Sequence, residues 1–184
     1  EQEEFSVWYE RHVSKLFEPK VSMQITECLD KNDPRLSPDF LFPEHVDFLP
    51  DRPIAIGLFR GTYCKGWELL RGSPELAELT GFDQSSGNIF YYEEIIESKV
   101  LDMFTHLVYK KKMAEGAIKP YDYFFQTIVN VHPNKSKRMV VRAHCWWFEN
   151  QPELHETDSN TFRVRIQDIS DLYKDILDMS PLPY

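Results

Sequence analysis

Residues 73–82 have the sequence SPELAELTGF, and this stretch decides how the segments around it are interpreted. Ser73 suits the cap of a helix, and proline is tolerated at the first helical position. Gly81 suits the end of the same helix, because glycine readily adopts the left-handed backbone that closes many helices. The stretch therefore predicts a short helix, and strands are expected before it in the sequence.

Two compact apolar segments precede this helix. Residues 54–59 favour a buried strand, and residues 67–71 favour its hairpin partner, since Gly61 and Gly66 bracket the turn between them. After the helix, residues 88–96 predict a further short helical piece.

The longest helix is predicted over residues 98–115, and Gly116 follows it. Apolar side chains recur along it at helical spacing and define its expected buried face, namely Val100, Leu101, Phe104, Leu107 and Val108. His106 falls beside this face rather than on it.

Three strands are predicted after the long helix, over residues 121–131, 138–148 and 162–167. Successive side chains of a strand point to opposite faces, so the residues divide into two sets. The inward set is expected to include Ile128, Met139, Val141, Cys145, Trp147, Phe162 and Val164. The outward set is expected to include Arg138, Val140, Arg142, His144, Trp146, Phe148, Arg163, Arg165 and Gln167. The whole order predicts an α+β fold, in which a five-stranded antiparallel sheet carries its helices on one face.

The first 53 residues differ in character from this core. Residues 3–18 carry apolar side chains at helical spacing, whereas five prolines between 34 and 53 favour an extended connector. Because the chain begins with Glu1, we expect it to be a piece of a longer protein. The expected organisation is an N-terminal helical extension with its connector at 1–53, the main domain at 54–170 and a helical tail at 171–184.

Composition limits the class of function. The formal net charge of −9 disfavours non-specific binding to nucleic acid. The three cysteines, Cys28, Cys64 and Cys145, form no CxxC pair, which favours a reducing compartment over a disulfide framework or a zinc site. No apolar run has the length of a membrane span and no signal peptide is recognisable, so an intracellular place, nucleus or cytoplasm, is expected.

Catalytic motifs are absent from the sequence. It contains no HExxH, no paired Cys–His pattern, no phosphate-binding GxxxxGK or GxGxxG, and no GxSxG. We therefore expect a non-catalytic protein without a metal or cofactor.

The stretch at 73–82 resembles the segment N-P-x-F-x-x-L-T-G-Y of PAS domains, with the same spacing and with Ser73 in place of the usual asparagine. Gly87 matches a glycine that commonly precedes the next helix, and the sequence DIS at 168–170 resembles the D-I-T that ends the last strand. The resemblance covers residues 54–170, and among PAS domains the chain is most similar to those of eukaryotic, including fungal, transcription regulators. It implies a module for sensing or protein interaction, which signals by forming a dimer or by binding a partner.

Some PAS domains hold a cofactor. The flavin-binding motif N-C-R-F-L-Q is replaced here by NIFYY at 88–92, which lacks the cysteine that light-driven adduct formation needs. Members that bind haem can use a histidine of the long helix, where this chain has His106. The alternative to an interaction module is thus a sensor of haem or of a small apolar ligand that controls a kinase or another effector.

The outward face of the sheet is the predicted interaction surface, with Arg142, Trp146, Phe148 and Arg163 as its residues. Large aromatic side chains on a face that would otherwise meet water indicate that something covers it. One candidate is the N-terminal helix, which combines Phe5 and Trp8 with several glutamates. The other is an external protein partner or a second copy, because arginine and aromatic residues are favoured at interfaces. Direct nucleic-acid binding is the least favoured interpretation.

Overall fold

The computed structural model describes residues 30, 32–62, 66–82, 87, 89–119, 122–131, 137–147 and 161–182. The helix predicted over residues 3–18 lies outside these ranges, as do Phe148 and the side chain of Trp147. The strands are β1 (Ala55–Thr62), β2 (Gly66–Gly72), β3 (Asp122–Val131), β4 (Lys137–Trp147) and β5 (Thr161–Asp168). The helices are η2 (Pro34–Leu36), α3 (Pro38–Leu41), α4 (Pro74–Thr80), η4 (Tyr92–Glu94), α5 (Lys99–Ala114), η5 (Ser170–Leu172) and α6 (Lys174–Asp178).

The five strands form one antiparallel sheet in the order β2-β1-β5-β4-β3. The last strand along the chain, β5, therefore lies at the centre, and β2 and β3 are the edges. This arrangement confirms the predicted α+β class and is consistent with a PAS-like fold.

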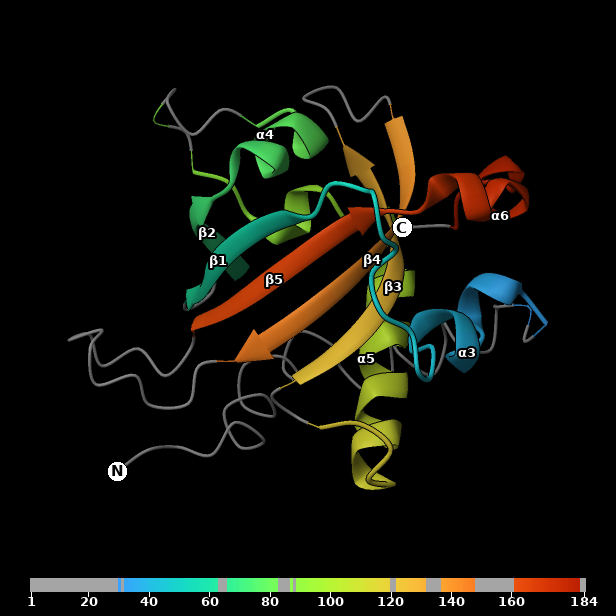
Figure 1. Cartoon of the computed structure of the whole chain (residues 1–184). Helices are drawn as coiled ribbons and strands as arrows, with labels where there is room; N and C mark the ends of the chain where they lie inside the picture. Colours follow the sequence, from blue (N-terminus) through green and yellow to red (C-terminus); the bar gives the residue numbers. More distant parts are fainter. Residues whose placement is uncertain are drawn as a thin grey trace, which may run out of the picture.

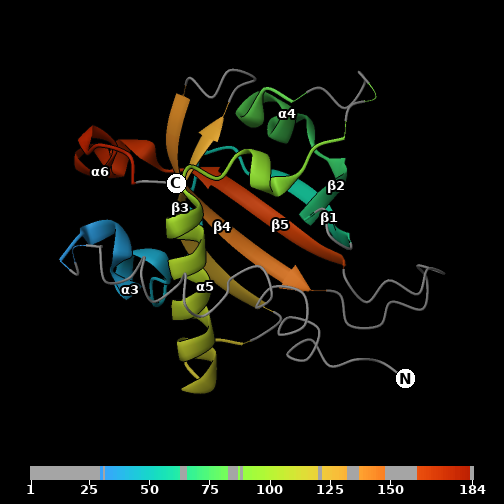
Figure 2. The ribbon, with the colours of Figure 1, turned by 180° about the vertical axis from the view of Figure 1, so that it is seen from behind.

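The two faces of the sheet are covered by different parts of the chain. Helices α4 and α5 lie on one face, here called the inner face, and α5 crosses it in front of β3 and β4 in the view from behind (Figure 2). The connector that follows α3 crosses the opposite, outer face, where it passes in front of β4 (Figure 1). Helices α3 and α6 lie beside the β3 edge in both views.

The start of α4 depends on Ser73 in a way that the sequence did not indicate. Its side chain does not cap the helix. Instead the Ser73 hydroxyl accepts a hydrogen bond from the Ile56 amide at 2.9 Å, and the Ser73 amide donates to the Ile56 carbonyl at 2.8 Å. This pair of bonds fastens the helix to β1. The predicted end is confirmed, because Gly81 has a φ of 69° in the left-handed region.

Helix α5 begins and ends as predicted, but its buried face is rotated. The Ser98 hydroxyl accepts a hydrogen bond from the Leu101 amide and caps the helix, and Gly116 follows its end with a φ of 73°. Leu107, predicted to be buried, is 42% exposed, while Met103 and Tyr109 are buried in the core. The prediction for Leu107 was therefore wrong, and His106 faces the interior more than expected.

Other predictions need correction. Ile128 was predicted to point inward, but it pairs with Val140 and so shares the outer side. Only a 3₁₀ turn, η4, is described within residues 88–96. The tail divides into η5 and α6 because Tyr173, which lies between them, departs from helical geometry. The connector also contains the two short helices η2 and α3, each starting with a proline and capped by Asp33 or Ser37.

Candidate functional site

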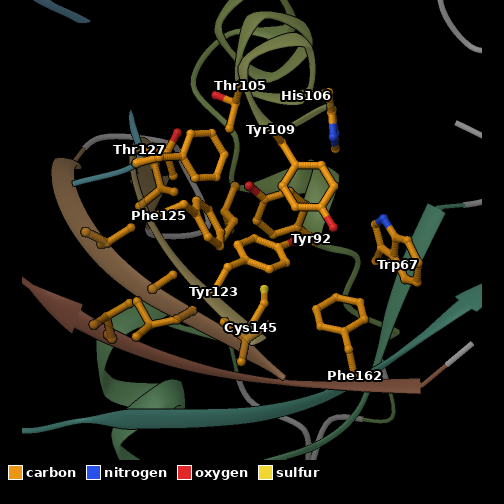
Figure 3. A pocket seen from close by; sticks show the side chains of 18 residues that line it. Trp67, Tyr92, Thr105, His106, Tyr109, Tyr123, Phe125, Thr127, Cys145 and Phe162 are labelled. Carbon is orange, nitrogen blue, oxygen red and sulfur yellow. The ribbon is translucent and has the colours of Figure 1, made fainter. Parts of the chain in front are cut away.

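An apolar cavity lies between the inner face of the sheet and helix α5 (Figure 3). Its volume is about 90 Å³, and side chains from β2, α4, α5, β3, β4 and β5 line it. Val141, Cys145, Phe162 and Val164, all predicted to face inward, are among the lining residues. On β3 the lining residues are Tyr123, Phe125, Thr127 and Val129, which is the opposite set from the one that contains Ile128.

Three tyrosines surround the middle of this cavity. Tyr92, Tyr109 and Tyr123 cluster there, and the Cys145 sulfur points towards them (Figure 3). The rings of Tyr109 and Tyr123 lie 4.8 Å apart. Burial raises the pKa of Tyr92 well above its ordinary value, so this phenol stays protonated at neutral pH.

Cys145 is a free thiol that is 4% exposed. Burial raises its pKa to about 12, and a hydrogen bond with the Tyr123 side chain offsets only part of that effect. Because the thiolate is the reactive form of cysteine, a thiol with this pKa is a poor nucleophile at neutral pH. Its position in the cavity wall therefore fits the predicted part of a small buried apolar residue.

Polar groups of η4 and α5 gather beside the cavity. Both carboxylate oxygens of Glu93 accept from the Trp67 amide, at 3.2 and 3.1 Å. Although Glu93 is exposed as a residue, burial of its carboxylate raises its pKa, and nearby Asp102 acts in the same direction. His106 lines the cavity, and its Nε2 lies 3.6 Å from the Asp102 carboxylate.

The size of the cavity limits what it can hold. Pockets for drug-sized ligands and cofactors have volumes of roughly 300–1,000 Å³. A cavity of about 90 Å³ suits a much smaller molecule, so the residues around His106 do not fit a haem.

The outer face of the sheet carries three parallel rows of side chains, set by the pairing of the strands. The first row crosses all five strands and consists of Arg71, Leu58, Arg163, Trp146 and Asp122. The second row consists of Ile56, Arg165, His144 and Phe124. The third row consists of Gln167, Arg142 and Gln126, which belong to β5, β4 and β3.

The first row is the most exposed of the three. Arg71, Arg163 and Asp122 are exposed, and Leu58 and Trp146 are half-buried. The guanidinium of Arg163 lies over the Trp146 ring at 5.0 Å from its centre. Of the predicted interaction residues, the structure thus brings these two together on an accessible surface.

Arg142, a third predicted interaction residue, is placed differently. It is 6% exposed, and its guanidinium donates to the Gln126 side chain at 3.0 Å and to the Asp47 carbonyl at 2.8 Å. The connector covers it, so Arg142 serves a contact within the chain. The sequence showed that this face is covered, but it gave no signal that residues 46–49 are part of the cover.

Neither a scan of protein-family models nor a search of curated proteins finds a match to this chain. Among the described residues, no group of three or more His, Cys, Asp or Glu side chains is arranged to hold a metal ion. Within the same ranges, no helix has the length and apolar character needed to cross a bilayer. The geometry of the cavity and of the outer face is therefore the basis for the functional argument.

Proposed function

We propose that this chain is a non-catalytic PAS-type regulatory module, which forms a dimer or binds a protein partner through the first row of the outer face. The observation that carries this proposal is the pair formed by the exposed Arg163 and the half-buried Trp146 within that row. Such a module belongs in a signalling protein or a transcription regulator of the nucleus or cytoplasm.

The chemistry of the first row supports a protein partner. Arginine and tryptophan are enriched among the residues that dominate binding energy at interfaces. Two arginines and the half-buried Leu58 belong to the same row as Trp146, although the chain as a whole has a net charge of −9. A partner surface that is acidic and aromatic complements this row, and the N-terminal residues 1–10 have that composition in the chain itself or in a second copy.

Replacing Trp146 by alanine is expected to weaken association about 30-fold, because the change removes the aromatic anchor on which Arg163 lies. Native mass spectrometry over a range of chain concentrations measures the fraction of dimer. Where the chain alone stays monomeric, the same variant is compared with the wild type in a pull-down of the partner.

The control is Leu172→Ala, which removes another apolar side chain that is 54% exposed and lies outside the sheet. This variant should associate like the wild type. Equal association of the Trp146→Ala variant and the wild type would contradict the proposed surface.

A second candidate function is the binding of a small apolar molecule, and the apolar cavity under α5 favours it. Its lining is almost entirely apolar or aromatic, and cavities of this kind can stay dry and accept small apolar molecules.

Filling the cavity tests this second function. Ala143 is 2% exposed and lies in the cavity wall, so Ala143→Leu places additional atoms in the space that a ligand would occupy. We expect native mass spectrometry to show a retained small molecule on the wild type and none on this variant. Identical spectra with no added mass would remove the support for a sensor.

A further inference from the structure

The third row of the outer face is polar although it is buried. Gln126 and Gln167 are 0% exposed and Arg142 is 6% exposed. Burying polar side chains costs free energy unless hydrogen bonds compensate it. The hydrogen-bond partners of these three side chains therefore indicate what the row binds.

Those partners are mostly main-chain atoms of the connector. The side-chain amide of Gln167 bonds to both main-chain polar groups of Leu49. Its oxygen accepts from the Leu49 N–H at 2.8 Å, and its nitrogen donates to the Leu49 carbonyl at 2.9 Å. Arg142 donates to the Asp47 carbonyl at 2.8 Å. Gln126 accepts from Arg142, which fixes the direction of the guanidinium.

This pattern resembles the way in which a sheet binds an additional strand. Main-chain hydrogen bonds hold such a strand whatever its side chains are, and pockets for alternate side chains add specificity. Here Gln167 offers one donor and one acceptor to Leu49, as a neighbouring strand would. Specificity comes from Phe48, whose ring lies 5.3 Å from that of Phe124 and 5.0 Å from the Arg165 guanidinium.

The segment 46–49, here called the strap, is more exposed than the row beneath it. None of its four residues is fully buried, and Asp47 is exposed. The residues on either side of it, His45 and Asp51, have φ values of 54° and 64°, in the left-handed region that costs non-glycine residues free energy. Segments with few buried side chains open most readily in folded proteins.

We propose that the third row is a binding track for an extended peptide segment of a partner protein, and that the strap is its resident occupant, which the partner's segment displaces. The segment that fits has an aromatic residue at the position of Phe48 and free main-chain groups at the positions of Asp47 and Leu49. This inference goes beyond the first row, because it concerns a different set of residues and a different kind of contact.

A fluorescent peptide with the sequence of residues 43–51, PEHVDFLPD, tests the proposal in trans. The full chain carrying Phe48→Ala has a weakened strap and an intact track, so it should bind the peptide at least about tenfold more tightly than the wild type. Adding Gln167→Leu to this variant keeps the side-chain volume but removes two hydrogen bonds, and should weaken binding about 30-fold. Fluorescence anisotropy gives the affinities, and circular dichroism confirms that each variant is folded.

Two further measurements make the result decisive. A peptide with alanine at the position of Phe48 should bind the Phe48→Ala chain about tenfold more weakly than the original peptide. In the wild type, hydrogen exchange should be faster for the strap amides than for those of β4 and β5. The proposal is overturned if the folded Phe48→Ala chain does not bind the peptide, if Gln167→Leu leaves the affinity unchanged, or if the strap exchanges as slowly as the central strands.

Discussion

Replacing Arg138 by methionine is expected to lower the free energy of unfolding by about 3–5 kcal/mol. Arg138 forms an ion pair with Glu97, whose side chain is 1% exposed. The same guanidinium donates to the Leu177 carbonyl at 2.6 Å and to the Met179 carbonyl at 3.1 Å. Methionine has a similar length but no donors, so the Glu97 carboxylate would stay buried without its ion-pair partner. The end of α6 would also lose two hydrogen bonds to β4.

Urea denaturation of the wild type and the variant measures this loss. Arg71→Met is the matched control, because it makes the same change at an exposed position of β2 and should alter stability by no more than about 0.5 kcal/mol. Adding Glu97→Leu to Arg138→Met removes the buried charge and should restore most of the stability. A loss below about 1 kcal/mol for Arg138→Met would place this pair with ordinary surface ion pairs instead.

Replacing Phe162 by alanine in the wild type is expected to lower the free energy of unfolding by about 3–5 kcal/mol. Phe162 is 6% exposed and lines the cavity. Its ring stacks on Phe59 at 5.4 Å and meets the edge of Trp67 at 4.7 Å. The variant loses these contacts, and the cavity grows by the volume of the missing ring.

Benzene should recover part of this loss, because the enlarged cavity keeps an apolar lining. We expect the melting temperature of Phe162→Ala to rise with benzene concentration, as for any ligand that binds only the folded state. Phe124→Ala, on the outer face under Phe48, is the control and should show a smaller rise, because its cavity is not enlarged. If benzene acts equally on both variants, the enlarged cavity is not where it binds.

The sequence predicted the faces of β4 and β5 well because successive side chains of a strand point to opposite faces. In β4 and β5, polar and apolar residues alternate, and every inward residue that the structure describes on these two strands lies on the predicted side. The glycines at 81 and 116 also ended their helices as predicted, since both adopt positive φ. These features depend only on neighbours along the chain.

Features that depend on distant contacts could not be predicted. Apolar residues occur around more than half the circumference of helix α5. Their spacing alone therefore could not show that Leu107 is exposed and Tyr109 is buried. On β3, apolar residues occur on both faces and Thr127 on the inner face is polar, so the alternation was hidden and Ile128 was assigned to the wrong side. Arg142 is buried only because residues more than ninety positions earlier cross over it.

The position of β5 affects how the chain folds as it is synthesised. The strands of the hairpins β1–β2 and β3–β4 are synthesised before residues 161–168, and among the described residues β5 is the strand that pairs with both hairpins. Until then, the facing edges of β1 and β4 have unpaired main-chain groups, which are sites where nascent chains associate wrongly. The sheet cannot close before β5 has been synthesised, so a chain that stops before residue 161 lacks the strand that lies between the two hairpins.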